Sequence, residues 1–179
     1  LLTPLVAVCA FCLAVSMIPG VFVFLQVEEI VKNWSLYGKT VAYAGSLALA
    51  LALFWLTMIF VVPAVNFIMP FRVKPFKGSW YSLPVIPWYI HNALVQMARY
   101  TVLDFVTPTP LNVLFYRMMG MKIGKGVVIN TSNISDPCLI TLEDYVTIGG
   151  SVTMFAHYGM KGYLIIEPVI IRRGATIGL

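Results

Sequence analysis

The last third of the chain, residues 123–179, places aliphatic residues at intervals of six, and this period constrains the fold more than any other feature. An α-helix repeats about every 3.6 residues and a strand every two, so neither alone gives this period. The period fits a solenoid whose flat faces are short strands and whose corners are turns, with one aliphatic side chain per face pointing inward. The aliphatic positions form three series: Ile123 and Ile129; Leu142, Ile148 and Met154; Ile165, Ile171 and Ile177.

Glycines follow several of these residues, as in Ile123-Gly124 and Ile148-Gly149. A tight corner favours glycine because a Cβ atom would crowd the turning backbone. We therefore predict a left-handed parallel β-helix over residues 121–179, incomplete at its C-terminal end, and the alternative is an ordinary sheet with a chance spacing. The chain begins without methionine and stops inside a hexapeptide, so we expect it to be part of a longer protein.

The first part of the chain has the composition of a membrane protein. Hydrophobic residues make up 60% of the sequence and charged residues 11%. Residues 1–27 and 40–71 contain no charged side chain, and both runs exceed the roughly 20 residues that a helix needs to cross the hydrocarbon. We predict a two-helix transmembrane anchor over residues 1–77, so that the fold class is membrane α + β.

Basic residues near the spans predict the orientation. The loop between the spans carries Lys32 and Lys39, whereas Arg72, Lys74 and Lys77 follow the second span. The positive-inside rule places the side with more basic residues in the cytoplasm, so both chain ends and the solenoid are expected there. The net charge of +5 does not by itself argue for a nucleic-acid partner. The expected partners are the lipid bilayer and either further copies or subunits of a larger membrane assembly.

Residues 78–120 have the pattern of an interfacial helical linker. Trp80, Tyr81, Trp88 and Tyr89 are aromatic residues of the kind found at headgroup level. Within a helix predicted over residues 85–105, the polar residues Asn92, Gln96 and Arg99 share one face, and the rest of the surface is apolar. His91 lies in this helix and is interpreted as a polar-stripe or interfacial residue.

A second, short helix is predicted over residues 111–119. Thr109-Pro110 has the pattern of an N-cap followed by proline at the first helical position, and Gly120 is a typical stop signal.

The six-residue count breaks once, between Met154 and Ile165, which are eleven residues apart. The interruption, residues 155–162, contains Gly159, Gly162 and His157, the solenoid's one histidine. Loops on a rigid scaffold commonly carry functional residues. Imidazole is also the side chain best suited to accept a proton near neutral pH, so His157 is the candidate general base.

Residues 120–179 resemble the hexapeptide acyltransferases, the group that contains galactoside and maltose O-acetyltransferases. The resemblance rests on His157 followed by Pro168-Val169-Ile170-Ile171 and by Gly174-Ala175-Thr176-Ile177-Gly178. Nearly the whole chain also resembles the membrane-bound terminal region of poly-lysine-synthetase-type nonribosomal peptide synthetases. That likeness rests on the order of segments, on Tyr-Arg-Met-Met-Gly-Met-Lys-Ile-Gly, and on Asp136-Pro137 before the stretch 142–149.

The resemblance implies direct acyl transfer, with acetyl-CoA, another acyl-CoA or a carrier thioester as the donor and no metal. His157 would deprotonate a hydroxyl or amine acceptor, with Glu167 or Asp144 as possible orienting carboxylates. Coenzyme phosphates would meet four basic residues: Lys122, Lys125, Arg172 and Arg173. The alternative interpretation is that these four basic residues lie at corners of the solenoid and are simply exposed to solvent.

The same segment allows two alternative functions to be compared with acyl transfer. A catalytically silent hexapeptide module, acting as a structural subunit or assembly platform, is favoured by Met160 and Gly162, which stand where the family tends to have an acidic residue and an arginine. A γ-type carbonic anhydrase needs three histidines around zinc, which the solenoid segment does not supply.

Overall fold

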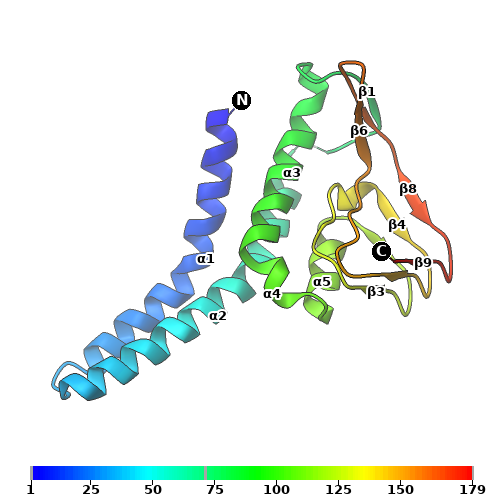
Figure 1. Ribbon diagram of the computed structural model, residues 1–179. Helices are drawn as coiled ribbons and strands as arrows, with labels where there is room; N and C mark the ends of the chain where they lie inside the picture. Colours follow the sequence, from blue (N-terminus) through cyan, green and yellow to red (C-terminus); the bar gives the residue numbers. More distant parts are fainter. Residues whose placement is uncertain (1, 71, 179) are drawn as a thin grey trace. The chain divides into compact units, whose positions relative to one another are not determined.

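The computed structural model in Figure 1 describes residues 2–70 and 72–178. Three residues at the boundaries of predicted segments lie outside the described residues: Leu1, Phe71 and Leu179. The chain divides into two compact units, residues 1–61 and 62–179, which are described separately.

Two long apolar helices open the chain, α1 (Leu2–Ile30) and α2 (Leu36–Ile68). Both are long and apolar enough to cross a membrane, with mean hydropathies of 2.5 and 2.4 over their apolar stretches. Large apolar side chains such as Phe11, Ile18 and Phe22 are exposed along α1. An exposed apolar surface of this kind suits lipid and is not expected of a helix in the core of a soluble protein.

Each of the two helices contains a proline. Helix α1 continues through Pro19 and α2 continues through Pro63, and α2 ends at Ile68, before Pro70. Figure 1 shows α1 changing direction along its length, as expected where proline removes an i→i−4 hydrogen bond.

Within the first unit, the helices meet through small residues. A Cβ atom built on Gly20 would lie 2.9 Å from both the Cβ and the carbonyl oxygen of Ala50, so only glycine permits this approach. The rings of Phe24 and Tyr43 also stack with centroids 5.5 Å apart. The two helices thus approach each other closely through small residues at Gly20 and Ala50.

Short helical elements follow after the strand β1 (Phe76–Ser79). They are η1 (Leu83–Val85), α3 (Ile86–Ala98), the π-helical turn η2 (Arg99–Leu103), α4 (Asp104–Val106) and α5 (Pro110–Met118). The Thr109 side chain accepts a hydrogen bond from the Leu111 backbone N–H at 3.2 Å, and Gly120 has φ +101°. The predicted N-cap and glycine stop of α5 are confirmed.

The polar stripe of α3 does not face outward. Asn92 donates a hydrogen bond to Asp136, and Gln96 donates one to the Ser135 hydroxyl, so the stripe is directed at the following β-rich segment. Trp88, predicted at headgroup level, is buried. Amphipathicity indicates which face of a helix is polar but not what covers it, and here protein covers part of it.

The aliphatic residues of the six-residue series stand in register in two parallel three-stranded ladders. One ladder joins β2 (Lys122–Ile123), β4 (Ile140–Leu142) and β8 (Val169–Ile171), and aligns Ile123, Leu142 and Ile171. The other joins β3 (Val128–Ile129), β5 (Thr147–Ile148) and β9 (Thr176–Ile177). It aligns Ile129, Ile148 and Ile177. A parallel bridge pairs Ile134 with Met154.

The corners between these strands repeat as well. Gly126, Tyr145 and Gly174, each three residues after an aligned aliphatic residue, have φ of +64°, +59° and +72°. A Cβ atom on Gly124 would lie 2.6 Å from the Asp144 backbone nitrogen, so this corner requires glycine.

The predicted loop over residues 155–162 and Ile165 depart from the repeat. The structure has a hairpin of β6 (His157–Met160) and β7 (Tyr163–Ile166), and β7 also pairs antiparallel with β1. Lys161 and Gly162 both have positive φ, as a two-residue type I′ turn requires. The assignment of Ile165 to the six-residue series was therefore wrong, because its strand belongs to this antiparallel sheet.

Candidate functional site

His157 begins the strand β6, opposite Ile166 of β7. Its side chain is 23% exposed, so the ring is mostly covered but remains partly open to solvent. The hairpin fixes its backbone through the ladder to β7, and β7 is fixed in turn by β1. His157 is therefore held on a paired strand and not on a free loop.

Asp136 lies against this histidine. It has φ 57°, ψ 44° and immediately precedes the 3₁₀ turn η3 (Pro137–Leu139). Aspartate is one of the few non-glycine residues that adopt this left-handed conformation with any frequency. The conformation of residue 136 lets a fully buried carboxylate reach His157 from a turn that precedes β4.

The contact between the two residues is short. Asp136 Oδ2 lies 2.5 Å from His157 Nδ1 and also accepts a 3.0 Å hydrogen bond from the Ala156 backbone N–H. The second oxygen, Oδ1, accepts hydrogen bonds from Trp88 Nε1 at 2.8 Å and Asn92 Nδ2 at 2.7 Å. Both oxygens of the buried carboxylate are therefore paired.

These contacts set the charge of Asp136. Burial by itself raises the pKa of the carboxyl, but the hydrogen bonds from His157, Asn92 and the Ala156 N–H outweigh it, and the pKa lies below its ordinary value. An ionised carboxylate can only accept hydrogen bonds, so the shared proton belongs on His157 Nδ1. In the neutral ring this leaves the lone pair on Nε2, the tautomer that a general base needs.

Aromatic rings flank the imidazole. Trp88 meets it edge-on, with ring centroids 4.8 Å apart and an interplanar angle of 73°. Phe155 lies on it at 5.5 Å and is half exposed. The histidine thus has one buried and one half-exposed aromatic neighbour.

The predicted orienting residues lie elsewhere. Asp144 accepts a hydrogen bond from the Lys125 backbone N–H at 2.8 Å and so supports a corner between strands. The Glu167 side chain is exposed, and its backbone N–H donates to the Ala156 carbonyl. Among the described residues, the carboxylate that touches His157 is that of Asp136.

The four predicted phosphate-binding residues are all exposed, but they differ in their partners. Arg172 Nη1 donates to Glu143 Oε1 at 2.7 Å, and the Arg173 backbone N–H donates to Glu143 Oε2. These two contacts, with the backbone N–H foremost, lower the pKa of Glu143. The Arg173 guanidinium lies over the Tyr145 ring at 5.5 Å. The two arginines therefore contact residues of a neighbouring turn, Glu143 and Tyr145. The side chains of Lys122 and Lys125 are exposed to solvent.

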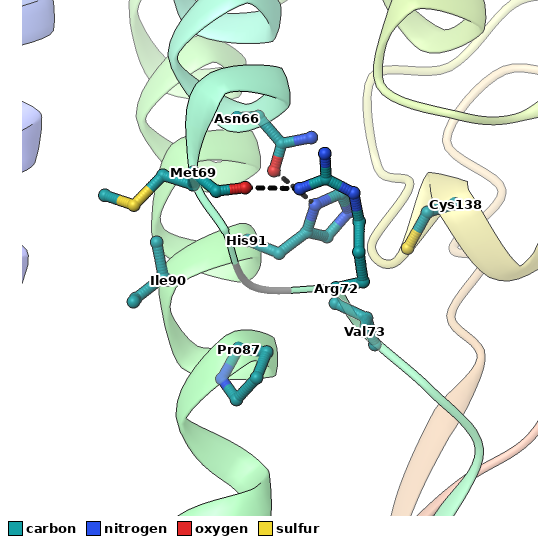
Figure 2. Close-up of a pocket in the computed structure, with 8 residues that line it drawn as sticks. All are labelled: Asn66, Met69, Arg72, Val73, Pro87, Ile90, His91 and Cys138. Atoms are coloured by element: carbon teal, nitrogen blue, oxygen red, sulfur yellow. Dashed lines mark hydrogen bonds between the residues drawn. The ribbon is translucent and has the colours of Figure 1, made fainter.

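A second histidine lies near Asp136, beside a small cavity of about 70 Å³ shown in Figure 2. His91 Nδ1 is 2.9 Å from Asn66 Oδ1, and its Nε2 is buried without a hydrogen-bond partner among the described residues. Burial lowers the pKa of His91 to about 4, with Asp136 acting in the opposite direction. Cys138 also lines the cavity, and burial raises the pKa of its thiol to about 12.

Among the described residues, no group of three or more His, Cys, Asp or Glu side chains is arranged so that it could hold a metal ion.

Sequence reasoning singled out His157 but did not place Asp136, Trp88 or Asn92 beside it. One available signal was the Asp136-Pro137 pair, since a turn residue before proline in an otherwise regular repeat marks a departure from it. Another was the spacing of Trp88 and Asn92, four residues apart and therefore on one face of a helix.

Comparison with known proteins gives one weak likeness. The chain is 26% identical over 98 residues to a delta-poly-L-ornithine synthetase of Acinetobacter baumannii (strain AB307-0294). The match covers 55% of this chain and 7% of that protein, so the chain spans a small part of the length of its curated relative. No protein-family profile matches the chain, and no solved structure matches it.

Proposed function

We propose that this chain is a membrane-bound acyltransferase segment in which His157 is the general base and Asp136 orients it. The observation that carries the proposal is the 2.5 Å contact between His157 Nδ1 and a buried carboxylate whose other sites are occupied by three further donors. A carboxylate held in this way fixes both the tautomer and the direction of the imidazole.

The scaffold of the proposed enzyme is a left-handed parallel β-helix of the hexapeptide type. The aligned ladders, the repeated left-handed corners and the glycine-dependent turn at Gly124 support this fold. Two spanning helices would anchor it, with the β-rich unit on the cytoplasmic face, as the basic residues after α2 favour.

In the proposed reaction, an acyl or aminoacyl thioester is the donor. His157 Nε2 accepts a proton as the acceptor nitrogen or oxygen attacks the thioester carbonyl, which forms a tetrahedral oxyanion. Backbone N–H groups of the solenoid would stabilise that oxyanion. Collapse breaks the carbon–sulfur bond, and the imidazolium returns the proton to the departing thiolate. The Asp136 carboxylate stabilises the transient imidazolium.

An amine is the favoured acceptor. The relative is named for making a poly-L-ornithine, a product whose monomers are joined when an amine attacks an activated carboxyl group. The donor would be a carrier thioester or an acyl-CoA, and a hydroxyl acceptor is the alternative that the general-base chemistry also permits.

The test is acyl transfer from an aminoacyl or acetyl thioester to ornithine by the detergent-purified protein, with the N-acylated product measured by mass spectrometry. His157→Gln should lower the rate by roughly 10²–10⁴-fold, as loss of a general base does. Asp136→Asn should also lower it, because an amide can offer its N–H to Nδ1 and favour the wrong tautomer. Asp144→Asn is the matched control and should retain activity; equal rates in wild type and His157→Gln would refute the assignment.

A catalytically silent module that acts as a structural subunit is the second hypothesis. The engagement of Arg172 by Glu143 favours it, since a guanidinium already bound to a carboxylate is less available for a coenzyme phosphate. Calorimetric titration with acetyl-CoA at low and high salt distinguishes the two hypotheses. Saturable, salt-sensitive binding supports the enzyme with a coenzyme donor, whereas absence of both binding and transfer from any thioester supports the structural role.

A further inference from the structure

The buried Asp136 carboxylate is held from two directions. Its Oδ2 is bound by residues of the hairpin segment, Ala156 and His157, whereas its Oδ1 is bound by two residues of α3. Those two, Trp88 and Asn92, are four residues apart and therefore lie on one face of the helix. The orientation of the carboxylate thus depends on a helix about fifty residues earlier in the chain.

The side chain of Trp88 contacts both members of the pair. Its indole N–H donates to Asp136 Oδ1 at 2.8 Å, and its ring meets the His157 ring at a centroid distance of 4.8 Å. The ring plane of His157 and the rotation of the Asp136 carboxylate are therefore both limited by the same side chain.

Trp88 is itself tightly packed. It is 7% exposed and belongs to an apolar cluster with Val85, Leu164 and Ile166. Trp80 meets it edge-on at 5.9 Å and Tyr89 at 5.0 Å. This packing fixes the indole N–H in space before any substrate arrives, which is what makes a neighbouring hydrogen-bond network precise.

We propose that Trp88 is a positioning residue that holds the Asp136 carboxylate through its indole N–H and the His157 ring through its edge. The inference rests on the proposed function, since positioning matters for catalysis only if His157 is the base. It makes α3, a helix of the segment expected to be interfacial, a working part of the site. Asn92 shares the contact to Oδ1 but not the contact to the imidazole.

The experiment compares Trp88→Phe with Trp80→Phe in the purified protein, in a His91→Gln background. Trp88→Phe keeps an aromatic ring and removes the N–H, whereas Trp80→Phe makes the same chemical change in the same cluster at a ring with no described contact to Asp136. His91 and Cys138 are the other titratable groups beside Asp136, and removing His91 simplifies the titration of the carboxyl.

The readouts are the NMR titration of the Asp136 side-chain carboxyl carbon and the ¹H–¹⁵N signature of the His157 Nδ1 proton. Loss of a donor should raise the pKa of Asp136 and weaken the Nδ1–H signal in Trp88→Phe, with no change in Trp80→Phe. In the transfer assay, kcat should fall about tenfold in Trp88→Phe with little change in KM, the factor expected for one charge-assisted hydrogen bond.

Unchanged NMR signatures in folded Trp88→Phe would overturn the proposal. If that variant fails to fold, the benzothienyl analogue of tryptophan at position 88 removes the N–H with almost no change of shape, and the same two readouts decide. If the NMR signatures change but no variant, including the parent protein, transfers acyl groups, the positioning contact is supported and the proposed function is refuted. The two failures are therefore distinguishable.

Discussion

Acidification should destabilise the second unit through His91. The side chain is 3% exposed, and its Nε2 has no described acceptor to receive a second N–H. Burial lowers the pKa of His91 from 6.5 to about 4. Between these values the unfolded chain binds a proton that the folded chain does not, so stability is complete above pH 6.5 and falls as the pH drops toward 4.

The magnitude follows from the shift. The difference of about 2.5 pKa units, at 1.36 kcal/mol per unit, gives a loss of about 3 kcal/mol at pH 4 relative to pH 7. Asp136 acts in a lower window: its pKa is depressed, so its contribution is present above the unfolded value of 3.8 and is lost only as the pH falls through its folded pKa. The two effects are therefore separated along the pH axis.

The assay is equilibrium denaturant unfolding in detergent at pH 7 and pH 4, with wild type, His91→Gln and His157→Gln compared. Glutamine at position 91 can still pair with Asn66 and does not titrate, so this variant should lose about 3 kcal/mol less than wild type on acidification. His157→Gln controls for the other histidine. Equal losses of the free energy of unfolding in wild type and His91→Gln between the two pH values would show that His91 does not cause the acid destabilisation.

Three further changes test the local structure by thermal or denaturant unfolding. Thr109→Ala removes the cap of α5 and should cost about 1 kcal/mol, whereas a cost near zero would show that the 3.2 Å bond contributes nothing. Gly124→Ala places a Cβ atom 2.6 Å from the Asp144 backbone nitrogen and should lower the free energy of unfolding by about 1–3 kcal/mol. Gly178→Ala is the control, because a Cβ atom there meets nothing within 4 Å, and it should lower the free energy of unfolding little. Lys161→Asn, at φ 49° in the hairpin turn, should stabilise by about 0.5–1 kcal/mol, and a destabilised variant would contradict the type I′ assignment.

The aliphatic positions of the parallel strands could be predicted because they follow a local rule, whereas the registers of the ladders come from the structure. Aliphatic residues six apart occupy equivalent places on successive faces, and Leu142, Ile148 and Met154 all lie on parallel pairings. The rule fails at Ile165 because the strand of Ile165 pairs with β1, whose sequence Phe-Lys-Gly-Ser carries no β-branched residue and a single strand-favouring residue, Phe76. Long-range pairing with a weak local pattern is not visible in one sequence.

The same limit applies to the site. His157 could be proposed as a candidate because it is the one histidine in an interruption of the repeat, which is a local observation. Asp136 could not be proposed in the same way, since its position beside His157 depends on a left-handed backbone and on a contact with Asn92, 44 residues earlier. The polar stripe of α3 was recognised, but an amphipathic pattern is equally compatible with water, headgroups or a buried carboxylate as its partner.

A regular solenoid cannot by itself make a unique site, because each coil presents the same backbone geometry as the next. In this chain the residue spacing along the two parallel ladders is unequal. On the first ladder, Ile123 to Leu142 is 19 residues and Leu142 to Ile171 is 29, a difference of ten. The second ladder shows the same step, 19 residues from Ile129 to Ile148 and 29 from Ile148 to Ile177.

The ten additional residues correspond in length to the hairpin that begins at His157 and ends at Ile166. Its base meets Asp136, which lies in the turn before β4 with a left-handed backbone, and Trp88 of α3 packs against both. The contacts of the candidate site therefore gather where three non-repeating segments meet beside the two parallel ladders. Substitutions along the aligned aliphatic residues should chiefly affect stability, whereas substitutions in these three segments can alter the site without disturbing the ladders.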